Sequence, residues 1–285
     1  MGWWEYLESH PTHAVTHLPD VNKIAQEEWG RLKSYCGLND VTLDVDYDSN
    51  YFSSRQGVLA AASRTMFLID NKWQSGALNK YGVKGTIVIK INPFVPNGWY
   101  VDDGTCETGY RYDLRSVLRH EIVHGAGVSS SIRDHDVGYA FGDHCYITSY
   151  DDHLKTKENN DFLNGCALTE TRSSDVFIAD VEIYNPSTFK VGSSFSHTHE
   201  DGVMYFSIPP MKCMDYDKNV FRILNELGAS CQTDTTGEFG GMSSEFNQTS
   251  NDGMVTSGAT KTYLNIYILA LVIIKCLMTR LIVYR

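Results

Sequence analysis

The string His120-Glu121-Ile122-Val123-His124 constrains this chain most, because its surroundings predict a helix that stops abruptly. Asp113 can cap the N-terminus of that helix, while Gly125 and Gly127 directly follow the string and should end it. The sequence therefore predicts a sharp turn just after His124. An apolar stripe at spacings near three and four supports the helix and consists of Leu114, Val117, Leu118 and Ile122.

The spacing of the two histidines indicates a metal site. Residues four apart lie on one face of a helix, so His120 and His124 can reach one zinc ion. Glu121 can reach a water molecule at the open coordination position of that ion. Zinc lowers the pKa of such a water to roughly 7, and a carboxylate can then take its proton. The string thus predicts zinc-dependent hydrolysis with Glu121 as general base; two incidental histidines on a surface helix are the alternative.

A catalytic zinc ion usually has three protein ligands, so a third must be found. The compact pattern His-Glu-x-x-His-x-x-Gly-x-x-His keeps its glycine at Gly127 but has Ser130 where its third histidine would stand. The segment 194–205 is the strongest alternative source, since two histidines two apart precede Met204 there. The candidate ligands are His135, His144, His153, His197, His199 and Glu200.

The periodicity of the rest of the chain predicts an α+β fold. Helices are expected over 20–35 and 217–227, a short helix over 57–63, and strands over 41–47, 85–91 and 176–184. In this order the elements indicate a twisted mixed sheet over the active-site helix, with a less regular C-terminal subdomain.

We expect the strand over 85–91 to border the cleft, where an extended substrate could pair with its edge by backbone hydrogen bonds. The pairing residues would be Thr86, Ile87, Val88 and Ile89. Two further expectations concern Tyr205, which would assist the oxyanion, and three acids that would bind calcium or orient histidines. A packed tyrosine and solvated loop acids are the simpler interpretations, and the acids are Asp103, Asp143 and Asp151.

The string with its glycines, followed by His197 73 residues after His124 (197 − 124) and by Met204, resembles the leishmanolysin-type metzincins. In that family an insertion displaces the third histidine, which precedes a Met-turn. The segment 196–200 is also similar to compact secreted relatives, and the resemblance covers roughly residues 20–230. It implies a metzincin-like zincin with His120, His124 and His197 as zinc ligands, Glu121 as base and Met204 in the Met-turn. His199 remains the alternative third ligand.

The resemblance and the string together predict a zinc endopeptidase that acts on a protein or peptide substrate. The alternatives are a catalytically idle, zinc-stabilised binding module at the cell surface and a zinc amidase acting on a non-protein substrate. A formal net charge of −11 and the lack of a basic run argue against nucleic acid as a partner, because phosphate binding needs clustered Lys and Arg.

Seven cysteines indicate an oxidising compartment. Six are spread over the part of the chain before residue 232, and three disulfides are the natural interpretation; six buried thiols of a cytosolic enzyme are the alternative. The sequence does not decide the pairing. The cysteines are at positions 36, 106, 145, 166, 213, 231 and 276.

The chain is expected to divide into an N-terminal segment 1–19, a peptidase domain 20–231, a polar linker 232–262 and an apolar tail 263–284. The tail would be a transmembrane helix or a lipid-anchor signal, although Lys275 and Arg280 interrupt it. Asn247 begins a glycosylation sequon in the linker. Residues 1–6 do not read as a signal peptide, so we expect an incomplete start. Together these features predict a secreted or cell-surface protein that its tail anchors to the membrane.

Overall fold

The computed structural model describes residues 18–55, 57–133, 138–141, 144–169 and 175–232. The chain divides into two compact units, Met1–Gly241 and Met242–Arg285, and all described residues belong to the first. The segment 1–17, most of the linker and the whole apolar tail therefore lie outside the described residues. Among the described helices, none is long and apolar enough to cross a membrane.

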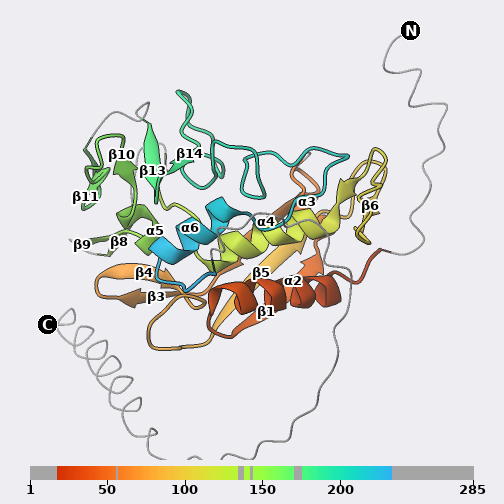
Figure 1. Cartoon of the computed structure of the whole chain (residues 1–285), viewed down its shortest axis with the longest axis horizontal. Coiled ribbons are helices and arrows are strands. Elements are labelled where there is room, and N and C mark those ends of the chain that lie inside the picture. Colours follow the sequence, from red (N-terminus) through yellow and green to blue (C-terminus); the bar gives the residue numbers. More distant parts are fainter. Residues whose placement is uncertain (1–17, 56, 134–137, 142–143, 170–174, 233–285) are drawn as a thin grey trace, which may run out of the picture. The chain divides into compact units, whose positions relative to one another are not determined.

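The described unit contains a three-stranded sheet on which two helices pack (Figure 1). Its central strand is β5 (Gly85–Ile91), which pairs in parallel with β1 (Val41–Tyr47) and antiparallel with β2 (Ala60–Arg64). The register aligns Val41 with Gly85 and Ala60 with Ile91. The sheet is therefore mixed, as the sequence predicts.

Two expectations about this sheet are wrong. Residues 57–63 do not form a helix, because the alanines at 60–62 belong to strand β2 and pair with β5. The segment Thr86–Ile89 is not an edge, because β5 has a neighbouring strand on both sides. The two edge strands are β1 and β2, and β2 is the one that contacts α4 (Leu114–Ala126) as well as β5.

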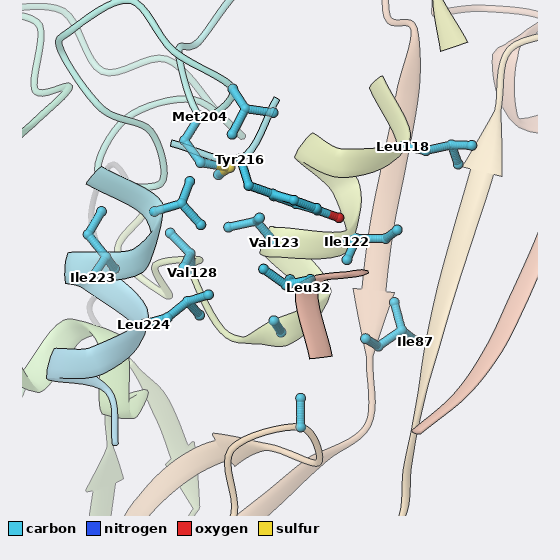
Figure 2. Packing of buried hydrophobic residues seen from close by; sticks show 14 of the residues in the cluster. Leu32, Ile87, Leu118, Ile122, Val123, Val128, Met204, Tyr216, Ile223 and Leu224 are labelled. Carbon is cyan, nitrogen blue, oxygen red and sulfur yellow. The ribbon is translucent and has the colours of Figure 1, made fainter. Parts of the chain in front are cut away.

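Two helices pack on the sheet. The first is α2 (Val21–Cys36), which begins at Asp20, ends at Gly37 and packs on β1. The second is α4 (Leu114–Ala126), which carries the His-Glu string and contacts α2, β2 and β5. Figure 2 shows Leu118 and Ile122 of α4 on the side of Ile87 from β5. Helix α4, which carries the His-Glu string, therefore lies against the sheet, as predicted.

The residues after α4 form small sheets and short helices. The expected strand at 176–184 is a hairpin of β13 (Val176–Ile178) and β14 (Val181–Ile183). The predicted last helix is α6 (Lys218–Glu226), which begins at the N-cap Asp217. The other described elements are α3 (Ser49–Phe52), β3 (Met66–Ile69), β4 (Lys72–Ser75), β6 (Trp99–Tyr100), β7 (Tyr112–Asp113), β8 (Tyr139–Phe141), β9 (His144–Tyr146), α5 (Ser149–Asp152), β10 (Lys155–Thr156), β11 (Leu163–Asn164) and β12 (Ala167–Leu168).

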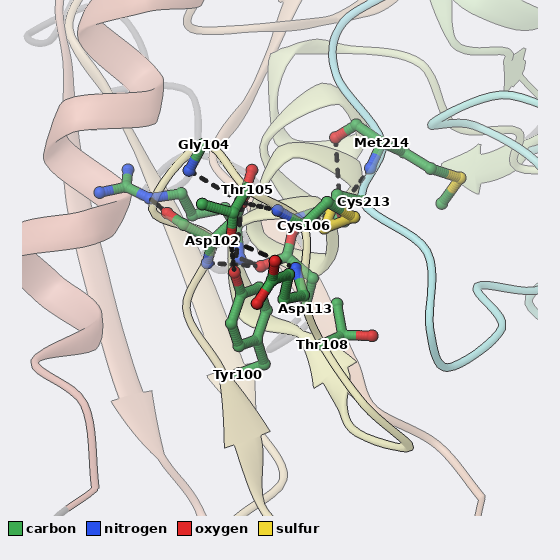
Figure 3. The surroundings of a disulfide bond; sticks show 12 residues. Tyr100, Asp102, Gly104, Thr105, Cys106, Thr108, Asp113, Cys213 and Met214 are labelled. Carbon is green, nitrogen blue, oxygen red and sulfur yellow. Dashed lines mark hydrogen bonds between the residues drawn. A yellow bond between two sulfur atoms is a disulfide. The ribbon is translucent and has the colours of Figure 1, made fainter. Parts of the chain in front are cut away.

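Six cysteines pair as three disulfides, which confirms the expected number and supplies the pairing. Two of them join distant parts of the chain: Cys36–Cys231 spans 195 residues and Cys106–Cys213 spans 107. The second ties the loop before α4 to the segment before α6 (Figure 3). The third disulfide is Cys145–Cys166.

Candidate metal centre

The helix that carries the His-Glu string is fixed at both ends. Asp113 accepts hydrogen bonds from the backbone N–H groups of Arg115 and Ser116 at its start. At its end Gly127 has φ 142°, a conformation that side-chain-bearing residues rarely adopt. A Cβ at Gly127 would also lie 2.7 Å from Cδ1 of Leu78. The predicted start at Asp113 and the end at Gly127 are thus confirmed, whereas Gly125 lies inside the helix and the chain turns at Gly127, three residues after His124 (127 − 124).

Three imidazole rings converge at one point. The Nε2 atom of His120 lies 3.1 Å from Nε2 of His124 and 3.1 Å from Nε2 of His197, and the last two atoms are 3.3 Å apart. Within the described residues this is the group of His, Cys, Asp or Glu side chains that could hold a metal ion. The structure therefore brings together the three residues that the resemblance implies.

His199, the alternative third ligand, lies outside this cluster. Its side chain is 61% exposed, and its Nδ1 atom lies 3.9 Å from the carboxylate of Glu182. The backbone explains the difference: His197 follows the buried Ser196, whereas the N–H of His199 donates to the carbonyl of Glu182 at the surface. The expectation that His199 could replace His197 is wrong.

The other ligand candidates do not join the cluster either. Nδ1 of His153 donates to the carbonyl of Ser149, and Glu200 accepts a hydrogen bond from Asn219. His135 lies outside the described residues, and the side chain of His144 is not described.

Each ligand ring is oriented by a backbone carbonyl. Nδ1 of His120 lies 2.7 Å from the carbonyl oxygen of Val203, and Nδ1 of His124 lies 2.7 Å from that of Val128. Nδ1 of His197 lies 2.9 Å from the carbonyl oxygen of Ser193. A carbonyl can only accept, so every Nδ1 must carry the proton. In the neutral rings, every Nε2 therefore presents a lone pair to the centre of the cluster.

This donor set fits a metal ion. Burial and, to a smaller extent, the charge of His197 lower the pKa of His120 to about 3; burial also lowers the pKa values of His124 and His197. Three neutral lone pairs that face one another cannot bond to each other, and a cation satisfies all three. With zinc–nitrogen distances of about 2.0–2.1 Å, tetrahedral geometry places the nitrogens about 3.3–3.4 Å apart. The cluster therefore has the size of a zinc site, although neutral imidazoles also suit other transition metals.

Glu121 directly follows His120 on α4 and is buried. Burial raises its pKa to about 8, against a hydrogen bond from the backbone N–H of Ala62 that lowers it. A cation at the three imidazoles would oppose the effect of burial and favour the carboxylate. Helix α4 thus carries one buried acid–base group, hydrogen-bonded to the edge strand β2, directly after a candidate metal ligand.

The segment around Met204, which orients the ring of His120, lies on the side of α4 that faces away from β5. Met204 is 1% exposed, and its carbonyl accepts the N–H of Thr198. Figure 2 shows Met204 near α6, on the side of α4 opposite Ile87. The preceding residue supplies the carbonyl that orients His120. The buried place of Met204 is compatible with a Met-turn.

The auxiliary residues have ordinary structural contacts. The ring of Tyr205 packs on Phe206, with centroids 4.4 Å apart. Asp103 accepts hydrogen bonds from Thr105 and Tyr100 in an exposed loop. Asp143 lies outside the described residues, and Asp151 is fully buried among neutral donors.

One supporting feature was missed in the sequence. Glu28 of α2 is fully buried and binds Arg119 and Arg115 of α4 and Arg31 of its own helix. Burial raises the pKa of Glu28, but the arginines outweigh it, so the net pKa lies below its ordinary value. Arg119, which directly precedes His120, also donates to the carbonyl of Met214. The sequence signal for this feature was a glutamate, Glu28, on the apolar face of the helix predicted over 20–35, because a buried carboxylate there needs a charged partner.

Comparison with protein-family models, with curated proteins and with solved structures finds no significant match. The interpretation of the site therefore depends on its own geometry.

Proposed function

We propose that the protein is a zinc-dependent endopeptidase of the leishmanolysin-like metzincin type. One observation carries the proposal: three neutral histidines present their lone pairs to one point, and the buried Glu121 directly follows one of them, His120, on α4. Zinc binding alone would not need that carboxylate. Its position beside the ligands supports hydrolysis over a binding module with an idle site.

The chemistry follows from the residues at the site. Zinc, when bound, supplies a Lewis acid that lowers the pKa of water to roughly 7 and polarises a carbonyl. Glu121 accepts the proton of the attacking water and later delivers it to the leaving amine. The hydrogen bond from Ala62 holds this carboxylate in place during both transfers. His120, His124 and His197 stay neutral because burial disfavours their charged forms.

The edge strand β2 is the proposed substrate platform, in place of β5. Leu59 accepts the N–H of Asn92, and Thr65 donates to the carbonyl of Thr86, so odd-numbered residues bond toward β5. Ala60, Ala62 and Arg64 alternate with them and turn their backbone groups away from β5. Ala62 reaches Glu121 on that side. An extended peptide that adds a strand here would pass the catalytic carboxylate.

We also propose that the protein works outside the cytosol. Three disulfides support an oxidising compartment. Attachment to a membrane by the apolar tail at 263–284 remains a proposal from the sequence.

The test compares the full-length chain with Glu121→Gln after production in an oxidising compartment. We expect about one zinc ion per chain in both proteins by elemental analysis, and cleavage of an unbiased peptide library only by the wild type. Zinc without cleavage in either protein would favour a binding module or a non-peptide substrate. Folded wild-type protein that binds no zinc would refute the proposal.

A further inference from the structure

We propose that Asp151 is a positioning residue of the metal centre, and that it holds the segment which orients two of the three histidines. The inference extends the proposed metal binding and depends on it. Asp151 lies on α5, 27 residues after His124 (151 − 124), and touches none of the ligands itself.

Asp151 anchors the turn that follows α4. Its side chain is fully buried, and one carboxylate oxygen accepts the N–H of Ser131 at 2.9 Å and the hydroxyl of Thr148 at 2.7 Å. The hydroxyl groups of Ser130 and Ser131 donate to the same carboxylate. The four donors are neutral hydroxyl or amide groups. One carboxylate thus fixes two consecutive residues of an irregular segment.

The first connection from this anchor leads to His124. The carbonyl of Val128, two residues before Ser130, accepts the Nδ1 proton of His124 at 2.7 Å. The segment between them has no regular structure, so its position depends on contacts such as those of Asp151. A shift of Val128 would rotate the ring of His124 away from the other two.

The second connection leads to His197. The N–H of Ser130 donates to Oγ of Ser196 at 3.1 Å, and Ser196 directly precedes His197. Ser196 is itself buried. Ser130 occupies the position at which the compact pattern has its third histidine. In this chain Ser130 instead contacts Ser196, which directly precedes His197, the candidate third ligand.

A carboxylate suits this task better than a neutral side chain. Its two oxygens can accept all four donors, whereas an asparagine offers one accepting oxygen and an NH₂ group. The N–H of Ser131 must keep an acceptor, so the NH₂ of an asparagine would face the hydroxyl of Ser130. That hydroxyl would lose its acceptor, and the connection to Ser196 would loosen.

The test uses Asp151→Asn in the full-length chain, with Asp113→Asn as a matched control. Asp113 is also fully buried and accepts from Asp102, Arg115 and Ser116, but no contact joins it to a carbonyl that holds a ligand. Zinc affinity is measured by chelator competition, the geometry of the site by the visible spectrum of the cobalt-substituted protein, and stability by thermal unfolding of the metal-free form. We expect Asp151→Asn to weaken zinc binding by about 10- to 100-fold and to change the cobalt spectrum. Asp113→Asn should lower stability and leave both metal readouts unchanged.

The outcomes are distinguishable. If the wild type binds neither ion, the proposed function fails and this inference fails with it. If the wild type binds and Asp151→Asn binds equally well with the same spectrum, the positioning role alone is refuted; equal losses in both variants would also refute it. Should Asp151→Asn not fold, Ser196→Ala removes only the connection to Ser130. An unchanged cobalt spectrum in that variant would overturn the proposal.

Discussion

The contact between helix α4 and the central strand β5 leaves no room for a side chain at Gly125. A Cβ at this position would overlap Cγ2 of Ile87 and lie 2.9 Å from its Cδ1 and 3.1 Å from its Cγ1. Ile87 is 1% exposed, so it cannot move into solvent. The substitution Gly125→Ala must therefore push α4 away from β5, and His124 would move with it.

The expected cost can be estimated from two opposing effects. Overpacking a buried contact costs about 1–3 kcal/mol, and alanine in a helix stabilises by about 1 kcal/mol relative to glycine. Gly125→Ala should thus lower the free energy of unfolding by up to about 2 kcal/mol. Gly30 of α2 is the matched control, because it is exposed and a Cβ there would have no neighbour within 4 Å. Gly30→Ala should raise the free energy of unfolding by up to about 1 kcal/mol.

Urea unfolding of both variants in the disulfide-bonded, metal-free form measures these changes. Opposite signs at the two glycines support the close approach of α4 to β5. If Gly125→Ala stabilised the protein as much as Gly30→Ala, the packing described for α4 would be wrong. Zinc affinity measured on the same samples should fall in Gly125→Ala alone.

Three further predictions address the ligands, the base and the covalent frame. His197→Ala should abolish zinc binding and His199→Ala should retain it; elemental analysis showing the reverse would exclude the observed cluster. In the metal-free protein the pKa of Glu121 is raised to about 8, so its stabilising contribution is complete below about pH 4.5 and is lost as the pH rises through 8. Between pH 6.5 and 8, above the ordinary pKa of histidine, the wild type should lose about 2 kcal/mol that Glu121→Gln does not lose; parallel urea profiles for the two proteins would contradict this. Replacing Cys36 and Cys231 by serine opens a loop of 195 residues and should lower the free energy of unfolding by up to about 5 kcal/mol; denaturant midpoints that coincide would argue against the pairing.

Local signals predicted the three long helices well because each carries its own boundaries. Asp113 and Asp217 cap α4 and α6 through their side chains, and Gly37 and Gly127 end α2 and α4. These effects act within one turn of the helix, so they can be recognised in the sequence. The same reasoning correctly predicts β1, whose residues alternate between two faces.

Strand β2 shows where local signals fail. Its alanines favour helix in isolation, yet Ala60 and Ala62 lie opposite Ile91 and Ile89 of β5. Small side chains suit this place because α4 packs over them. The pairing partner lies more than twenty residues away, and propensity within the segment cannot reveal it. The error over 57–63 also produced the wrong edge strand.

The choice of the third ligand could not be predicted for the same reason, because the contacts that decide it come from residues distant in the sequence. His197 and His199 have nearly identical local surroundings in the sequence, and both could point at a metal on an extended segment. What separates them is tertiary: the N–H of Tyr184 donates to the carbonyl of His197, and Glu182 accepts the N–H of His199. The bond to Tyr184, which follows β14, goes with the buried position of His197, and the bond to Glu182 of β14 leaves His199 at the surface.

The metal-free site is held together by parts of the chain that do not touch the metal position. Three neutral imidazoles with facing lone pairs gain nothing from one another, so their carbonyl partners must keep them in place. Those carbonyls lie in irregular segments, which Asp151 and Asp217 fix through backbone N–H groups. The ion pairs of Glu28 with Arg115 and Arg119 fix α4 to α2. Because a metal ion would bind the folded arrangement and not the unfolded chain, zinc should raise the free energy of unfolding of the whole domain with the logarithm of the ratio of free zinc to its Kd.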